Sequence, residues 1–211
     1  MGKRIVIMKG GAAEYAVQRS RFIADTAAVR DEETAQAFLQ EIKKKYYDAR
    51  HHCYGWILEG GRREKSGDDG EPSGTAGAPI LAALERQGIT DGLIVVTRYF
   101  GGIKLGTGGL TRAYAHAAAQ GIAASTLAEL QTLRRVAVTV AYPLFSPLEN
   151  WLQKNEIRVA DKSYAENVTL TLYLSPDATE TVKKAVADLT AGQACLKDQG
   201  EIETLVPLSP A

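Results

Sequence analysis

Two glycine-rich stretches hold most of the residues in this sequence that could do chemistry. In the second stretch, residues 97–114, cationic side chains surround a run of glycines that leads into a helix-like segment. Backbone N–H groups in such a loop, and at the start of a helix, attract anions. The sequence therefore predicts a site for phosphate or an RNA backbone, made of Arg98, Gly101, Gly102, Lys104, Gly106, Thr107, Gly108, Gly109 and Arg112.

The same residues also allow a purely structural interpretation. Glycine is retained where the chain needs a positive φ or a close approach of two backbones. Arg98 and Arg112 could pair with the carboxylates of the first glycine-rich stretch instead of binding a ligand. A glycine-rich strand–loop–helix does not by itself decide between these alternatives.

The first stretch, residues 68–77, carries the carboxylates Asp68, Asp69 and Glu71. Such a cluster could bind a hard cation or supply acid–base catalysis, but Asp-Gly and Glu-Pro are also common in turns. We favour the turn and predict no metal site, no catalytic residue and no cofactor. The stretch continues with Ser73, Gly74 and Thr75, and either Ser73 or Thr75 could cap the next helix.

A third candidate is the basic and aromatic run at residues 43–51. Aromatic side chains among cations are what binding of single-stranded nucleic acid uses, although such a run is usually a solvated helix end. The chain has 25 basic and 25 acidic side chains, so its formal charge is zero. A strongly basic nucleic-acid module is therefore excluded, and any polyanion site must be a local patch.

The elements that position these residues can be read from the apolar pattern. Residues 31–46 predict a helix, 52–58 a strand and 62–72 a polar loop. The apolar run Leu93–Val96 is typical of a strand covered on both faces. A helix from about Gly108 to Gly121 is rich in small residues, which would let it lie close against a sheet.

The apolar pattern restarts after residues 122–131, which predicts a boundary there. Residues 132–211 then follow the order strand, helix, strand, strand, helix, strand, which is the ferredoxin-like order. We expect one domain at 1–126 and a second at 132–211. Cys53 and Cys195 show no metal-binding or disulfide spacing, so a reducing, cytoplasmic location is expected, without a membrane segment.

The two stretches, DDGEPSGTAG at 68–77 and TRYFGGIKLGTGGLTRAY at 97–114, closely match the signature of the Impact/YigZ family across residues 50–115. The resemblance implies an α+β protein of two domains. The amino-terminal domain would be similar to the second domain of ribosomal protein S5. The smaller, ferredoxin-like carboxy-terminal domain would be similar to the last domain of elongation factor G.

The resemblance also implies a function in the regulation of translation, by binding rather than by chemistry. The expected partner is the ribosome, RNA or a translation-associated protein, and neither DNA nor a membrane is expected. An alternative is a kinase-like enzyme, because the S5-like fold class includes small-molecule kinases whose glycine-rich loop holds nucleotide phosphates. Residues 101–109 would then bind the phosphates. A third alternative is a protein-binding adaptor in which the glycine signature is structural.

Overall fold

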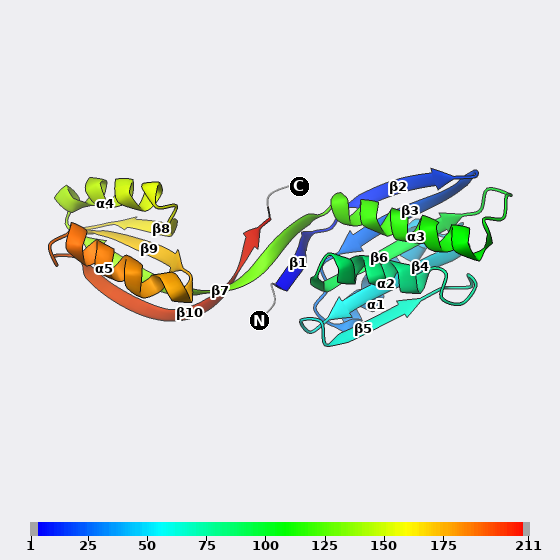
Figure 1. Cartoon of the computed structure of the whole chain (residues 1–211), viewed down its shortest axis with the longest axis horizontal. Coiled ribbons are helices and arrows are strands. Elements are labelled where there is room, and N and C mark those ends of the chain that lie inside the picture. The colour runs from blue at the N-terminus through cyan, green and yellow to red at the C-terminus, as the bar shows by residue number, and fades with distance from the viewer. Residues whose placement is uncertain (1–3, 209–211) are drawn as a thin grey trace. The chain divides into compact units, whose positions relative to one another are not determined.

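The computed structural model describes residues 4–208, which form two compact units (Figure 1). The first unit contains the described residues up to Leu130 and those from Leu205 onward, and the second spans Gln131–Thr204. Both units combine helices with a sheet. The prediction of a mixed α+β protein with two parts is therefore confirmed.

The sheet of the first unit is centred on β6, which runs antiparallel to β3 on one side and to β4 on the other. β2 extends the sheet beyond β3, and β5 extends it beyond β4. β1 pairs in parallel with the beginning of β6. The bounds are Arg4–Lys9 (β1), Ala12–Val17 (β2), Ser20–Ala27 (β3), His51–Leu58 (β4), Arg63–Gly67 (β5) and Ile89–Tyr99 (β6).

Helices cover both faces of this sheet. Ile94 and Val96 of β6 pack in one core cluster with α2 (Gly77–Arg86) and α3 (Gly106–Ala123). Leu93 and Val95 face the other way and pack with α1 (Glu32–Lys45). Because side chains alternate along a strand, a strand buried on both faces needs a continuous apolar run. The prediction made from residues 93–96 is confirmed.

Two other local predictions have different outcomes. The helix predicted at 31–46 is α1, where the Asp31 carboxylate accepts a 2.7 Å hydrogen bond from the Thr34 backbone N–H. The polar loop predicted at 62–72 is wrong in part, because it contains the strand β5. β5 pairs only with β4 among the described strands, and its side chains are mostly exposed, so the strand has no apolar pattern to reveal it.

The second unit has the element order β7-α4-β8-β9-α5-β10. Its strands lie in the order β10-β7-β9-β8, and its core contains Val136, Leu148, Leu170 and Val186. The alternation of strands and helices predicted for this part is therefore present. The bounds are Thr126–Val140 (β7), Tyr142–Lys154 (α4), Arg158–Tyr164 (β8), Val168–Leu174 (β9), Thr179–Leu189 (α5) and Cys195–Pro207 (β10), with a short 3₁₀ turn at Pro176–Ala178.

The segment 122–131, predicted as a boundary, contains no separate linker. α3 ends at Ala123 and β7 begins at Thr126, and β7 pairs with β1 through Leu130 and with β9 from Arg134 onward. The Leu208 backbone N–H donates to the carbonyl of Leu127, 3.0 Å away, in the first unit. The compact units thus differ in their limits from the expected 1–126 and 132–211. Independent folding of the two parts stays a prediction.

The close approach of α3 to the sheet makes a testable prediction at Gly121. A Cβ atom added there would lie 2.9 Å from the Ala24 Cβ and 3.2 Å from the Thr26 Cγ2. We expect Gly121→Val to lower the free energy of unfolding by about 1–3 kcal/mol, because overpacking displaces the helix. The matched control is Ala119→Val on the exposed side of α3. Urea denaturation measures the stability of both variants. Equal urea midpoints would contradict the close packing of α3 against the sheet at Gly121.

Candidate functional site

The Asp68 carboxylate organises the loop before α2. Its two oxygens accept hydrogen bonds of 2.8–3.0 Å from the backbone N–H groups of Gly74, Ala76 and Gly77. Burial alone would raise the pKa of Asp68, but these N–H groups together lower it below its usual value. Asp68 therefore serves as the cap of α2 from eight residues before Ala76.

This arrangement corrects the prediction that Ser73 or Thr75 caps the helix. α2 begins at Gly77, and its N-cap residue Ala76 makes no side-chain cap. The Thr75 hydroxyl instead donates to the carbonyl of Pro72 at 2.6 Å, within the preceding turn. Ser73 is exposed. Local capping rules search the residues next to a helix, so they could not find an acceptor as distant as Asp68.

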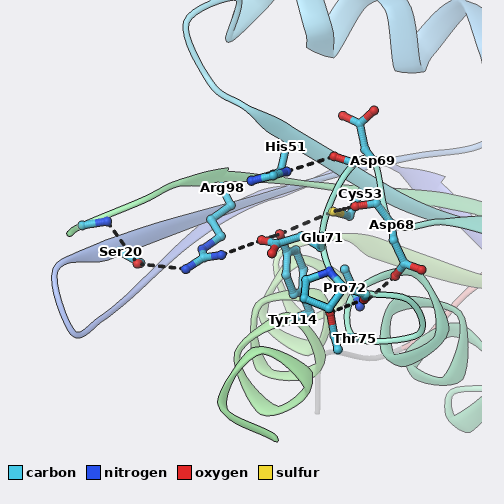
Figure 2. Close-up of polar contacts among 12 residues, drawn as sticks. Ser20, His51, Cys53, Asp68, Asp69, Glu71, Pro72, Thr75, Arg98 and Tyr114 are labelled. Atoms are coloured by element: carbon cyan, nitrogen blue, oxygen red, sulfur yellow. Dashed lines mark hydrogen bonds and ion pairs between the residues drawn. The ribbon is translucent and has the colours of Figure 1, made fainter. Parts of the chain in front are cut away.

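The Asp69 carboxylate turns the opposite way, toward β4 and α1. It accepts from the His52 backbone N–H at 2.8 Å and from Lys43 Nζ at 3.1 Å. Burial raises the pKa of Asp69, but the His52 N–H and the Lys43 ammonium outweigh it, and the pKa is lowered. The carbonyl oxygen of Asp69 lies 2.9 Å from His51 Nδ1 (Figure 2). Asp69 thus joins the first glycine-rich stretch to the end of α1 and the start of β4.

Glu71 lies at the centre of a buried network that links the two glycine-rich stretches (Figure 2). Its Oε1 accepts from Arg98 Nη1 at 2.6 Å and from the Tyr114 hydroxyl at 2.8 Å. Only 4% of the Glu71 side chain and 7% of the Arg98 side chain are exposed. The network therefore fastens the first stretch to the end of β6 and to α3.

Two neutral groups complete this network. Cys53 Sγ lies 2.9 Å from the Asp68 carbonyl oxygen and 3.4 Å from the Tyr114 hydroxyl. Burial raises the pKa of the Cys53 thiol to about 12. Burial also raises the pKa of Tyr114, and the neighbouring Cys53 and Glu71 raise it further. Both groups are protonated at neutral pH, so neither is a nucleophile there.

Arg98 is also held from its other side. Its guanidinium carbon lies 5.4 Å from the centre of the Phe22 ring and 5.5 Å from that of Phe100. Its Nη2 is 3.5 Å from Ser20 Oγ, which in turn accepts from the Gly101 backbone N–H at 3.2 Å. This placement favours the structural alternative for Arg98, with Glu71 as its partner, over contact with a phosphate.

The remaining cations of the second stretch have a different environment. Lys104 and Arg112 are exposed, and within residues 4–208 neither forms a hydrogen bond or ion pair. α3 has no side-chain cap and no acidic residue in its first turn. The sequence contains no Asp or Glu at all from residue 92 to residue 128. The two cations therefore keep their charge available for an external anion.

The glycines of the second stretch divide into two kinds. At Gly101 an added Cβ would lie 2.1 Å from the Arg19 carbonyl oxygen, so the close approach to the β2–β3 turn requires glycine. Gly102 and Gly106 have φ of +85° and +70°, and an added Cβ would meet nothing within 4 Å. Gly108 and Thr107 are exposed in the first turn of α3, and Gly109 is half-buried there. The loop thus presents exposed backbone beside its two unpaired cations.

The structure separates the carboxylates of the first stretch by function. Asp68 caps a helix, Asp69 bonds to β4 and α1, and Glu71 neutralises Arg98. Among residues 4–208 no three His, Cys, Asp or Glu side chains gather as metal ligands would. The geometry is therefore that of a scaffold that holds an exposed cationic loop. Sequence reasoning missed Ser20 and Tyr114, because their contacts span 81 and 43 residues.

Comparison with known proteins places this geometry in a family. Residues 18–122 match the model of the Impact N-terminal domain, and residues 138–193 match a domain of unknown function, DUF1949. IMPACT family member YvyE of Bacillus subtilis is 36% identical over 94% of this chain and 92% of its own length. IMPACT family member YigZ of Escherichia coli is 32% identical over 83% of this chain and 88% of its own length.

A solved structure agrees with this assignment. The crystal structure of a protein described only as hypothetical has a TM-score of 0.60 and 30% identity, and covers 93% of this chain and 97% of its own. The chain belongs to the IMPACT family, as its signature stretches predict. None of these relatives is described by an enzymatic activity.

The capping function of Asp68 can be tested by its pH dependence. We expect Asp68→Asn to lower the free energy of unfolding at pH 7 by about 1–3 kcal/mol, because the amide keeps one acceptor oxygen and leaves at least one backbone N–H facing its NH2 group. Because the folded-state pKa is lowered, the carboxylate stabilises the protein fully above its unfolded pKa of about 3.9. That contribution is lost as the pH falls through the folded-state pKa.

Chemical denaturation of the wild type and of Asp68→Asn at several pH values would measure the difference between their free energies of unfolding. This gap should close under acid conditions. Asp161→Asn, on the exposed strand β8, is the control and should leave stability nearly unchanged throughout. A gap that stays undiminished as the pH falls well below about 3.9, where the unfolded chain binds a proton at Asp68, would contradict the assignment.

Proposed function

We propose that this chain regulates translation by binding, and that it catalyses no reaction. Its partner is the ribosome, RNA or a translation-associated protein, met through the second glycine-rich stretch. The observation that carries the proposal is that the acidic side chains of the site have partners within the protein, whereas two of its basic side chains have none among the described residues. The carboxylates of the first stretch are bound within the protein, whereas Lys104 and Arg112 are exposed in a carboxylate-free segment.

The fold supports the same proposal by analogy. In this account the first unit is similar to the second domain of ribosomal protein S5. The second unit, with strand order β10-β7-β9-β8, is ferredoxin-like and similar to the last domain of elongation factor G. Both of these are parts of the translation machinery. Because fold does not establish function, the exposed cations carry more weight than the analogy.

The kinase-like alternative would use the loop 101–109 to hold nucleotide phosphates. Phosphoryl transfer also needs carboxylates that bind Mg²⁺ and a group that positions the nucleophile. Two acids of the first stretch, Asp68 and Glu71, accept hydrogen bonds from the start of α2 and from Arg98 and Tyr114. A carboxylate committed in this way is poorly placed for metal binding, so the site favours binding over turnover.

A cytoplasmic location is part of the proposal, since ribosomes are found there. Within the described range, no helix combines the length and apolar character that crossing a membrane requires.

The proposal predicts how the protein binds to ribosomes. We expect the double variant Lys104→Ala, Arg112→Ala to cosediment less with purified bacterial ribosomes and to lose less affinity as salt rises. Each phosphate contact contributes about 0.7–0.9 to the slope of log affinity against log salt. The slope should therefore become shallower by roughly 1.4–1.8 for the two cations, while the thermal midpoint is nearly unchanged.

The matched control is the double variant Arg30→Ala, Arg62→Ala. Both arginines are exposed and have no partner in the described part of the chain. They follow the ends of β3 and β4, whereas the second glycine-rich stretch lies beside the starts of these strands. Equal binding by both double variants would contradict the proposal. ATP-dependent phosphoryl transfer that is lost with Lys104 and Arg112 would favour the kinase-like alternative.

A further inference from the structure

The fold brings the basic and aromatic run at residues 43–51 to the same end of the sheet as the second glycine-rich stretch. His51 of β4 pairs with Arg98 of β6 in the sheet register. Just beyond this pair, the Tyr99 hydroxyl donates to the Asp48 carboxylate at 2.7 Å. The run at residues 43–51 and the second glycine-rich stretch, two basic segments about fifty residues apart in sequence, are therefore neighbours.

The turn between β2 and β3 lies at this end as well. The Ser20 hydroxyl accepts from the Gly101 N–H at 3.2 Å, and the Arg19 backbone touches Gly101. Figure 1 shows this turn and the loop before α3 at the same end of the first unit. We name the exposed residues of these three neighbouring segments the loop-end surface: Arg19, Lys44, Tyr47, Arg50, Phe100 and Lys104.

Two aromatic side chains of the loop-end surface are exposed without a structural need. Tyr47 is 85% exposed and Phe100 is 51% exposed, although large apolar groups normally gain by burial. The Arg98 guanidinium lies over the Phe100 ring and is itself held by Glu71, which steadies the ring. Tyr47 directly precedes Asp48, whose bond to Tyr99 joins the two segments. At this end of the sheet, Phe100 therefore lies on the α3 face beside Arg98, and Tyr47 lies on the α1 face next to Asp48.

The charges of the loop-end surface are unbalanced in favour of cations. Three carboxylates near it have partners: Asp25 bonds Lys45, Asp48 bonds Tyr99, and Asp69 bonds Lys43. Arg19, Lys44, Arg50 and Lys104, by contrast, form no hydrogen bond or ion pair within residues 4–208. The positive potential at this end is thus local, although the whole chain is neutral.

We propose that the loop-end surface binds single-stranded RNA, with bases stacked on Tyr47 and Phe100 and phosphates neutralised by the cations around them. Flat exposed rings among unpaired cations suit unpaired bases on a charged backbone. A duplex would satisfy the cations but could not offer its bases to the rings. This inference rests on the proposed function and deepens it, because it names the partner as RNA and identifies the aromatic side chains that contact the bases.

The test uses the full chain and a fluorescein-labelled twelve-nucleotide oligouridylate, followed by fluorescence anisotropy. Tyr47→Ala and Phe100→Ala should each weaken binding roughly 5- to 150-fold, the range for loss of one stacked base. Tyr47→Phe keeps the ring and should bind as the wild type does. Tyr164→Ala, which removes a 58% exposed tyrosine from the second unit, should have no effect.

A second measurement, tryptophan fluorescence quenching, reports contact between bases and rings directly. It does not depend on a variant that weakens binding. In Phe100→Trp and Tyr47→Trp the new indole should be quenched by the oligonucleotide, with the same midpoint as the anisotropy change. Of the two native tryptophans, Trp56 is 3% exposed and Trp151 is half-buried in the second unit, so both contribute a constant background. The indole of the control variant Tyr164→Trp should not be quenched. An unquenched indole at both positions under saturating RNA would overturn the inference.

The two proposals fail in distinguishable ways. Tight binding of the oligonucleotide that is indifferent to both alanine variants would overturn the stacking surface. Binding of ribosomes that depends on Lys104 and Arg112, with no affinity for the oligonucleotide, would also overturn it and would point to a protein or duplex partner, while the proposed function stands. Absence of binding to both ribosomes and oligonucleotide would overturn both proposals.

Discussion

The buried ion pair between Arg98 and Glu71 is the contact on which the arrangement of the site depends. It joins the end of β6 to the first glycine-rich stretch, and Tyr114 of α3 donates to the same carboxylate. Because both side chains are almost fully buried, removing one partner leaves an uncompensated charge, which typically costs about 3–5 kcal/mol. This contact thereby links the conformations of the two loops.

This constraint explains why the charged side chains of the two stretches differ in exposure. Glu71, Asp68 and Asp69 are drawn inward, where they fix Arg98, α2 and the start of β4. Lys104 and Arg112 follow a sharp turn through Gly101 and stay in solvent. A rigid acidic scaffold thus supports an exposed cationic loop, which is how many binding sites are built on stable folds.

Sequence reasoning could predict the elements with a strong apolar period and the family signature. It found α1 from its helical spacing and β6 from the run at 93–96, but missed β5, whose exposed polar residues carry no pattern. It could not tell Arg98 from Lys104, because burial depends on Glu71 and Tyr114, distant in sequence. Nor could it predict that Tyr47 and Phe100 lie at the same end of the sheet, since that follows from the register of β4 and β6.

We propose that the second glycine-rich stretch and its neighbours form the binding surface, while the first stretch is scaffold. Hydrogen–deuterium exchange of the full chain, with and without purified bacterial ribosomes, tests this claim most directly. We expect ribosomes to slow exchange at residues 99–112 and 46–50 and to leave residues 158–174 of the second unit unchanged. Protection confined to the second unit, or absent from residues 99–112, would contradict it.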